Sequence, residues 1–181
     1  GADWQALGLQ AAIEAPRARL AMAGLTRMMD TAMPVTGISP HAVIDPSATL
    51  GTGVSIGPFT VVGAGAVIGD GCQIAQHVTI AAGVSIGQAA QLHAGVRIQS
   101  RVRLGARVVI QPNAVIGADG FSFVTAAPSN VEIGRKTLGK TPFEPPMDAT
   151  QHRIHSLGGV EIGDDVEIGA GSTVDAGTIR P

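Results

Sequence analysis

The chain is poor in aromatic residues, in charge and in cysteine. Of its 181 residues, 3% are aromatic, none is tyrosine and 14% are charged, with a net charge of -2. This balance provides no basic surface of the kind that nucleic acid requires, so nucleic-acid binding is not expected. The single cysteine, Cys72, cannot form an internal disulfide, and its place among small residues predicts a buried side chain.

Long apolar runs are missing as well. No stretch of about 18 apolar residues occurs, and no charged segment precedes an apolar run near the start. We therefore expect neither a membrane span nor a signal peptide, and predict a soluble, cytoplasmic protein. Hydrophobic residues nevertheless make up 45% of the sequence, and because they recur at a fixed interval, the 25 glycines do not indicate disorder.

The fixed interval is six residues. A period of six fits neither an α-helix nor a simple alternating strand, so it indicates an internal structural repeat. The residues at this interval are all aliphatic, namely Ile38, Ile44, Leu50, Ile56, Val62, Ile68, Ile74, Ile80, Ile86, Leu92, Ile98, Leu104, Ile110 and Ile116.

A second position of the repeat, four residues after each aliphatic one, holds small side chains such as Ala66 and Val78. Glycine directly follows the aliphatic residue in about half of the repeats, where we expect a tight turn with positive φ. Each hexapeptide thus predicts one short strand and a corner, and three hexapeptides close a triangular coil of roughly eighteen residues. Parallel pairing between coils then gives an all-β, parallel β-helix with the large aliphatic side chains inside.

The repeat divides the chain into four segments: residues 1–36, 37–117, 118–158 and 159–181. In the first, the apolar stretch between Pro16 and Pro34 predicts one helix of about four turns. The second holds the coils, the third is an inserted loop, and the fourth is a resumed coil with Ile162, Ile168 and Val174 at the six-residue spacing. The chain is expected to be a fragment, because it ends on an open coil.

The inserted loop is the first place to look for function. It includes Asp119, Phe121 and Phe123, which supply two of the four phenylalanines in the chain, and a proline-rich stretch at 141–147. Loops this long within a compact fold are usually functional or disordered. A loop that projects from a flat wall is a natural place for a pocket or a partner contact.

The histidines do not predict a metal site. Metal binding of the hexapeptide carbonic anhydrase type needs three imidazoles, and no convincing third ligand joins His77 and His93. We expect His41, His77 and His93 on solvent-facing walls or corners. His152 and His155 lie where the loop returns to the wall, and could position an acyl carrier or a nucleotide phosphate, or simply bond to backbone.

Several motifs resemble those of the UDP-3-O-acylglucosamine N-acyltransferases of lipid A biosynthesis. Residues 38–48 (ISPHAVIDPSA) resemble the opening of their β-helix, and residues 19–23 the helix before it. Residues 117–121 (GADGF) are similar to the segment that interrupts their repeat, and residues 159–169 to the coil that follows. Residues 173–177 (TVDAG) resemble their Thr-Ile-Asp-Arg-Gly, with Ala176 in place of the arginine.

The resemblance implies a left-handed β-helix that forms a homotrimer. It also implies transfer of a 3-hydroxyacyl group from acyl carrier protein to the 2-amino group of a UDP-linked acylglucosamine, with no cofactor. The family's base is a histidine that would lie about one coil beyond Pro181, so no catalytic residue is assigned and the 181-residue chain is expected to be inactive. His77 stands in a similar context but is displaced by one residue, which turns its side chain elsewhere.

Six residues are candidates for substrate binding: Asp119, Gly120, Phe121, Phe123, His155 and Asp175. Asp119 and the two phenylalanines are expected to line the groove for the acyl chain or pantetheine, although the phenylalanines could instead plug the base of the loop. Asp175 either lines the groove or orients the catalytic histidine. Two alternatives remain open, a coenzyme A-dependent hexapeptide acetyltransferase and a non-catalytic structural trimer.

Overall fold

The computed structural model describes residues 3–31, 33–34, 36–140, 142 and 148–181. Its chain forms two compact units, residues 1–34 and residues 35–181. The first unit contains one helix, α1 (Ala18–Met29), which has 12 residues, or about three turns where the sequence predicted four. None of its residues is buried. No helix in the described part of the chain is long and apolar enough to cross a membrane.

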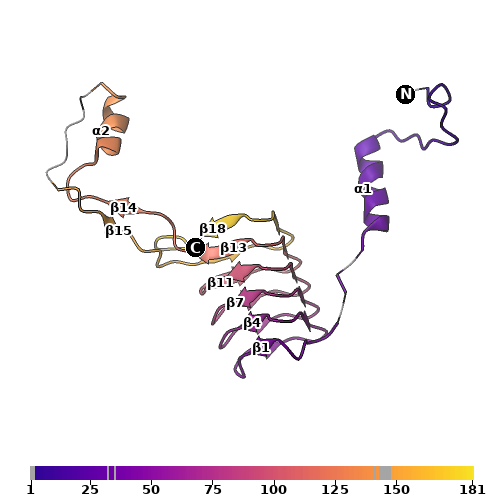
Figure 1. Ribbon diagram of the computed structural model, residues 1–181, viewed down its shortest axis with the longest axis horizontal. Coiled ribbons are helices and arrows are strands. Elements are labelled where there is room, and N and C mark those ends of the chain that lie inside the picture. The colour runs from indigo at the N-terminus through magenta and orange to yellow at the C-terminus, as the bar shows by residue number, and fades with distance from the viewer. Residues whose placement is uncertain (1–2, 32, 35, 141, 143–147) are drawn as a thin grey trace. The chain divides into compact units, whose positions relative to one another are not determined.

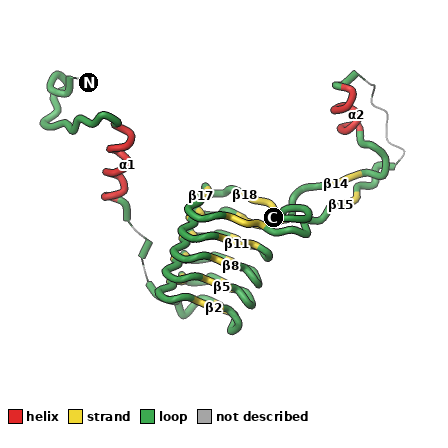
Figure 2. The backbone as a smooth tube through the Cα atoms, turned by 180° about the vertical axis from the view of Figure 1, so that it is seen from behind, coloured by secondary structure: helices red, strands yellow, loops and turns green. Residues whose placement is uncertain are grey.

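The second unit is a parallel β-helix built from very short strands (Figures 1 and 2). The strands of the coils are β1 (Val43–Ile44), β2 (Thr49–Leu50), β3 (Ser55–Ile56), β4 (Val61–Val62), β5 (Val67–Ile68), β6 (Gln73–Ile74), β7 (Thr79–Ile80), β8 (Ser85–Ile86), β9 (Gln91–Leu92), β10 (Arg97–Ile98), β11 (Val102–Leu104), β12 (Val109–Ile110), β13 (Val115–Ala118), β16 (Val160–Ile162), β17 (Glu167–Ile168) and β18 (Thr173–Asp175).

Every third strand joins the same sheet, so the coil has three walls. The sheet orders are β1-β4-β7-β10-β13-β18, β16-β11-β8-β5-β2 and β17-β12-β9-β6-β3, and all these pairings are parallel. Within each wall the aliphatic residues pair directly, as Val62 does with Ile80 and Ile98 with Ile116. The predicted three-sided coil is confirmed.

The interior contains both repeating positions of the hexapeptide. The aliphatic residues from Ile56 to Ile116 are at most 4% exposed, and the small residues between Thr60 and Ala114 are fully buried. Cys72 is among the latter; its thiol donates to the carbonyl of Gly87 at 3.1 Å, and burial raises the pKa of this thiol. The predicted buried role of Cys72 is confirmed.

The glycines that follow the aliphatic residues have another role than the one predicted. Among them only Gly117 has positive φ, at 85°. A Cβ at Gly63 would lie 2.6 Å from the backbone nitrogen of Ala82 in the next coil, so glycine is needed for close approach of two backbones. From Gly53 to Asn113, the left-handed residue of each corner comes two positions later, as at Gly65 (φ 64°). The expectation of positive φ directly after the aliphatic residue was therefore wrong.

The inserted segment has secondary structure of its own. Strands β14 (Phe123–Val124) and β15 (His152–Arg153) pair antiparallel and form the stem of an excursion that leaves the helix near β13 and β18 (Figure 1). Beyond β14 lies α2 (Asn130–Thr137), which Ser129 and Glu132 cap reciprocally. In the proline-rich stretch, residues 141 and 143–147 lie outside the described residues.

The coil resumes in the same spatial register after the excursion. Although the six-residue phase differs in sequence, Ile162 pairs with Leu104, Ile168 with Ile110, and Val174 with Ile116. The aliphatic columns are therefore continuous across the insertion. The excursion interrupts the sequence repeat without interrupting the core.

A charged pair joins the resumed coil to the one before it. Arg107 donates to both carboxylate oxygens of Asp165, at 2.6 and 2.7 Å, and the amide of Ala106 donates to Asp164 at 2.8 Å. The same corner of an earlier coil has a similar bond, from the amide of Thr52 to the carboxylate of Asp70 at 2.7 Å. There, Gly53 occupies the position that Arg107 has in the later coil. The bidentate pair with Arg107 lowers the pKa of Asp165 through its hydrogen bonds.

Replacing Asp165 with asparagine is expected to reduce the loss of folding stability that occurs as the pH falls. Because the folded pKa of Asp165 lies below the ordinary value of 3.8, its stabilisation is present above that value and disappears as the pH falls through the folded pKa. Between pH 6 and pH 3 the urea unfolding midpoint should therefore fall further for the wild type than for Asp165→Asn.

A matched control is Glu161→Gln, which removes one carboxylate from the same coil. Its contact with Arg103 is long, at 3.9 Å, and both side chains are largely exposed. If Asp165→Asn loses as much stability on acidification as Glu161→Gln, the proposed role of the Arg107 pair is incorrect.

Candidate functional site

The root of the excursion brings several polar groups into contact. The amide of Gly120 donates to Oγ of Ser156 at 3.1 Å, and its carbonyl accepts a hydrogen bond from Arg153 at 3.2 Å. Arg153 also contacts the carboxylate of Asp119 at 3.5 Å. Asp175 is also close, since a Cβ at Gly120 would stand 3.6 Å from its Oδ2. Three predicted site residues, Asp119, Gly120 and Asp175, thus lie around one point.

The two predicted phenylalanines form an aromatic pair next to this root. The rings of Phe121 and Phe123 have centroids 5.0 Å apart and planes inclined by 60°. The guanidinium of Arg153 lies over the Phe123 ring, 5.4 Å from its centroid, which is within cation–π range. Arg153 therefore connects the carboxylate of Asp119 to the aromatic pair.

A cavity of about 640 Å³ opens beside the aromatic pair, between the hairpin stem and α2. Its lining residues are Phe121, Ser122, Phe123, Val124, Thr125, Ser129, Val131, Glu132, Arg135 and Gln151. The apolar walls come from the two rings and two valines. Half of the polar lining residues belong to α2 and its cap, and the other half, Ser122, Thr125 and Gln151, lie in the two chain segments of the hairpin stem. A pocket with apolar walls and a few polar groups is typical of sites for small organic groups.

Two polar residues of the cavity lining, Ser129 and Glu132, form the N-terminal cap of α2. The carboxylate of Glu132 accepts hydrogen bonds from the amide of Ser129 at 2.7 Å and from its hydroxyl at 3.0 Å. These bonds, aided by the nearby Lys136 and Arg135, lower the pKa of Glu132. The carboxylate is therefore engaged in capping the helix, and Arg135 is the one cationic side chain among the residues that line the cavity.

The candidates do not all share the cavity. Phe121 and Phe123 line it, whereas Asp119, Gly120 and Asp175 lie at the root beside it. His155 is exposed and is not among the lining residues. Phe121 is 92% exposed, which argues against a plug at that position, whereas Phe123 is 38% exposed and packs under Arg153 at the root of the excursion.

Sequence reasoning missed the residues that organise the site. Arg153 joins Asp119, Gly120 and Phe123, and the 7% exposed Ser156 holds the amide of Gly120. Both residues lie in the segment that leads back from the excursion to the coils. In that segment, only His152 and His155 were candidates on sequence grounds. The capping pattern Ser129–Glu132, which can be read from the sequence, would have located α2 and with it Arg135.

The described residues contain no group of three His, Cys, Asp or Glu side chains that could hold a metal ion. The ring of His77 stacks on Phe59, with centroids 5.2 Å apart. The groups that the structure brings together at the site are an aromatic pair, an arginine next to a carboxylate, and a cavity with apolar walls.

Comparison with curated proteins finds relatives along the whole chain. It is 66% identical over 181 residues to the UDP-3-O-acylglucosamine N-acyltransferase of Ruegeria pomeroyi, and 67% identical over 183 residues to the protein of that name from Paracoccus denitrificans. Each match covers 99% of this chain and 49% of the relative, so the chain spans about half the length of these relatives. A protein of the same name from Alkalilimnicola ehrlichii is 43% identical over 154 residues, which are 85% of this chain and 38% of that protein.

Two further comparisons concern the β-helix. A family model described as the GMPPB C-terminal domain matches residues 38–120. Among solved structures, the acetyltransferase domain of PglB from Neisseria gonorrhoeae superposes with a TM-score of 0.52 at 18% identity, covering 88% of this chain and 58% of that one. The chain is thus a left-handed parallel β-helix of hexapeptide repeats, and the predicted resemblance of its sequence to UDP-3-O-acylglucosamine N-acyltransferases is confirmed along nearly its whole length.

Proposed function

We propose that this chain forms the central part of an enzyme that N-acylates UDP-3-O-(3-hydroxyacyl)glucosamine in lipid A biosynthesis. The supporting observation is the 66–67% identity to two proteins of that name across 99% of the chain. The proposed donor is a 3-hydroxyacyl group on acyl carrier protein, with no further cofactor. The proposed assembly is a cytoplasmic homotrimer.

In this proposal the excursion binds the donor. The cavity beside Phe121 and Phe123 receives the acyl chain or the pantetheine arm, because two phenylalanines and two valines line it together with a few polar groups. Arg135 faces the polar end of the ligand. Arg153, held by Asp119, keeps the ring of Phe123 in place for the contact.

The chemical step requires a base and an oxyanion donor. A neutral base takes the proton from the sugar amine as its nitrogen attacks the thioester carbonyl, and the thiolate of the carrier leaves. None of the described residues is assigned as this base. In this proposal Asp175, which lies at the carboxyl end of β18 beside Gly120, orients a base supplied by a neighbouring coil.

The central test is an acyl-transfer assay on two proteins, the 181-residue chain and the chain extended to the length of its relatives. We expect transfer of 3-hydroxyacyl groups to the UDP-aminosugar by the extended protein alone. Absence of transfer from acyl carrier protein to any UDP-aminosugar would contradict the proposal. Use of acetyl coenzyme A as the preferred donor would favour the acetyltransferase alternative.

The role of the cavity predicts a specific kinetic defect. In the extended protein, Phe123→Ala should raise KM for the acyl donor about tenfold with little change in kcat, since loss of one apolar contact of about 1.4 kcal/mol affects binding rather than chemistry. Leu138→Ala is the matched control, because Leu138 is 83% exposed and does not line the cavity. Equal KM values for both variants would show that the cavity is not part of the donor-binding site.

A further inference from the structure

The corner between β10 and β11 holds an arginine where the two coils before it hold glycine. Arg101 has φ of 63°, and the equivalent residues of the two preceding coils, Gly65 and Gly83, have φ of 64° and 69°. A residue other than glycine carries a conformational cost in this left-handed region, and such a residue persists only where its surroundings hold it. The arginine at this corner is therefore expected to make an interaction that glycine cannot make.

Arg101 makes that interaction with the segment that leads from the excursion back to the coils, residues 154–159, which we call the returning segment. Its guanidinium donates to the carbonyl oxygen of Ser156 at 3.0 Å. Its own carbonyl oxygen accepts from the amide of Val160 at 3.2 Å, and a Cβ at Gly159 would collide with that oxygen. Arg101 thus holds the returning segment on the coil through both its side chain and its backbone.

Ser156 joins the returning segment to the start of the excursion. It is 7% exposed, and its Oγ accepts from the amide of Gly120 at 3.1 Å. A Cβ at Gly120 would lie 3.8 Å from this Oγ and 3.6 Å from Oδ2 of Asp175, so the hydroxyl and the carboxylate are both close to Gly120. A continuous series of contacts therefore leads from the guanidinium of Arg101 through Ser156 and Gly120 to the Asp175 carboxylate.

The carboxylate at the end of this series is unpaired. Asp175 ends β18 and is exposed, and among the described residues its carboxylate has no hydrogen-bond or ion-pair partner. Its backbone is fixed next to the excursion, since the amide of Ala176 donates to the carbonyl oxygen of Ala118 at 2.8 Å. Packing against neighbours such as Gly120 therefore determines where the carboxylate lies, and its oxygens can accept a hydrogen bond from another group.

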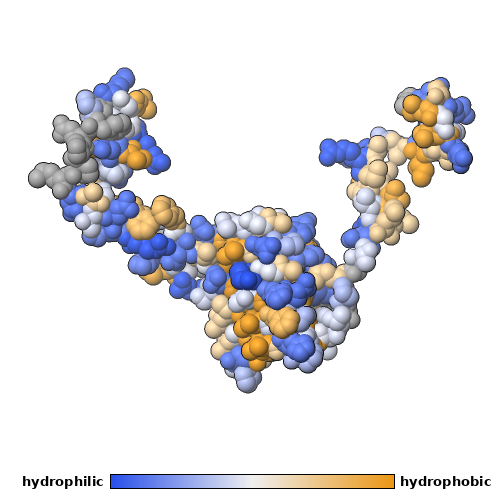
Figure 3. Space-filling view, in the orientation of Figure 1, coloured by the Kyte–Doolittle hydropathy of each residue, from blue (hydrophilic) through white to orange (hydrophobic). Residues whose placement is uncertain are grey.

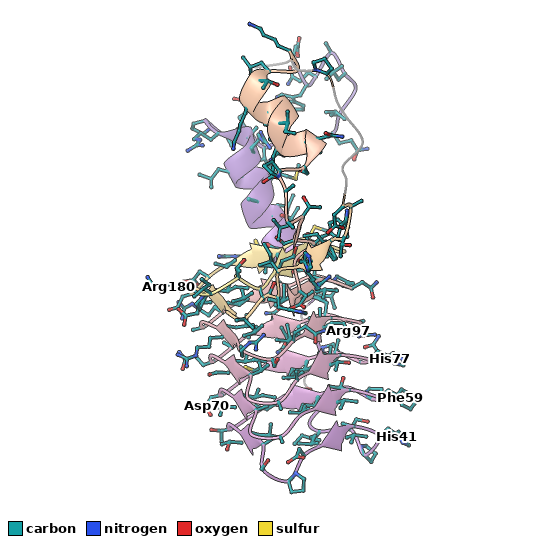
Figure 4. All side chains as sticks on the ribbon, turned by 90° about the vertical axis from the view of Figure 1, so that its left-hand side faces the viewer. His41, Phe59, Asp70, His77, Arg97 and Arg180 are labelled. Atoms are coloured by element: carbon teal, nitrogen blue, oxygen red, sulfur yellow. The ribbon has the colours of Figure 1, made fainter. Side chains whose placement is uncertain are left out.

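Polar contacts hold the root of the excursion. On the face shown in Figure 3, the stem between the coils and α2 has mainly hydrophilic surface. Arg180 also lies near the returning segment, but Figure 4 shows its side chain at the outer edge of the last coil. Its approach to Gly158 is through its carbonyl oxygen, which would lie 2.6 Å from a Cβ there. Arg101 is therefore the arginine that holds the returning segment with its guanidinium.

We propose that Arg101 and Ser156, together called the root clamp, position Asp175 for acyl transfer by fixing Gly120 beside its carboxylate. This role rests on the proposed function, in which Asp175 orients the base. A carboxylate that orients a base tolerates little displacement, because rates fall steeply when reacting groups are misplaced by about 1 Å. The root clamp takes no part in the chemical step; its two members are positioning residues that act through Gly120.

The kinetic test compares two arginines that both occupy left-handed corners. In the extended protein, Ser156→Ala and Arg101→Gly should each lower kcat about tenfold and leave KM for donor and acceptor within about twofold. Arg107→Gly is the matched control, because Arg107 has φ of 56° but pairs with Asp165 at another corner. It should lower stability and leave kcat unchanged. Glycine also removes the strained φ in both arginine variants, and circular dichroism should show the wild-type fold.

Two further measurements show whether the root clamp acts through Gly120 and Asp175. In an Asp175→Ala background, Ser156→Ala should change kcat by less than about twofold, because the two substitutions remove the same interaction. In the 181-residue chain, the Gly120 amide should exchange with solvent about tenfold faster in both clamp variants, and at the wild-type rate in Arg107→Gly. Wild-type kcat in the clamp variants, additive effects with Asp175→Ala, or unchanged exchange at Gly120 would each overturn the role of the clamp alone. An extended wild type that transfers no acyl group would instead contradict the proposed function, and this role with it.

Discussion

Replacing Ile68 with alanine is expected to lower the free energy of unfolding by about 3 kcal/mol, within the range of about 2–5 kcal/mol typical of such core truncations. Ile68 is 1% exposed and stacks between Leu50 and Ile86 in the column of its wall. The strand around it has two residues and is paired on both sides, so the backbone cannot shift to fill the cavity.

Urea unfolding followed by circular dichroism measures this loss. Val67→Ala is the control, since Val67 precedes Ile68 on the same strand and is 46% exposed. It should cost less than about 1 kcal/mol because little apolar area returns to water. Equal losses for the two variants would mean that the column of aliphatic residues does not carry the stability of the coil.

The second large effect is expected from Gly63→Ala, although it adds a single methyl group. The new Cβ would lie 2.6 Å from the nitrogen of Ala82 and 2.8 Å from the carbonyl carbon of Ala81. Both are backbone atoms of the next coil, so the two coils must separate locally and their hydrogen bonds must lengthen. We expect a loss of about 3 kcal/mol, at the upper end for overpacking.

The matched control for this substitution is Gly53→Ala. Gly53 has φ of +68°, and no atom lies within 4 Å of the place that a Cβ would take, so alanine there meets strain but no clash. Its cost should be about 1 kcal/mol, and hydrogen exchange in the next coil should be unchanged. Amides around Ala82 should lose protection in Gly63→Ala alone; protection equal to that of the wild type would contradict the close-approach account.

The fold could be predicted because both of its determinants recur along the sequence. The aliphatic residue and the small residue four places later repeat often enough for spacing alone to define the three-sided coil. The roles of Gly63 and Gly65 could not be separated in this way. Gly63 allows close approach of the next coil, and Gly65 adopts the left-handed conformation of the corner. The spacing of residues in the sequence does not distinguish these two roles.

The site was harder to predict because its residues do not repeat. Asp119 and the phenylalanines were found because they lie where the six-residue repeat stops, and the family motif at residues 117–121 covers Asp119 and Phe121 but not Phe123. Arg153, which contacts Asp119 and Phe123 from 34 and 30 positions away, has no signal of its own in the sequence. His155 was chosen for its residue type, and lies outside the cavity.

The spatial register of Ile162 on Leu104 has a consequence for how this protein can vary. The coil before the excursion and the coil after it meet through their own side chains and through the Arg107–Asp165 pair, so neither depends on what lies beyond the stem. The tip of the excursion can therefore lengthen, shorten or change sequence over generations while the prism stays the same. If the excursion binds the acyl donor as proposed, selection for a new donor can act on this tip while the coils stay unchanged.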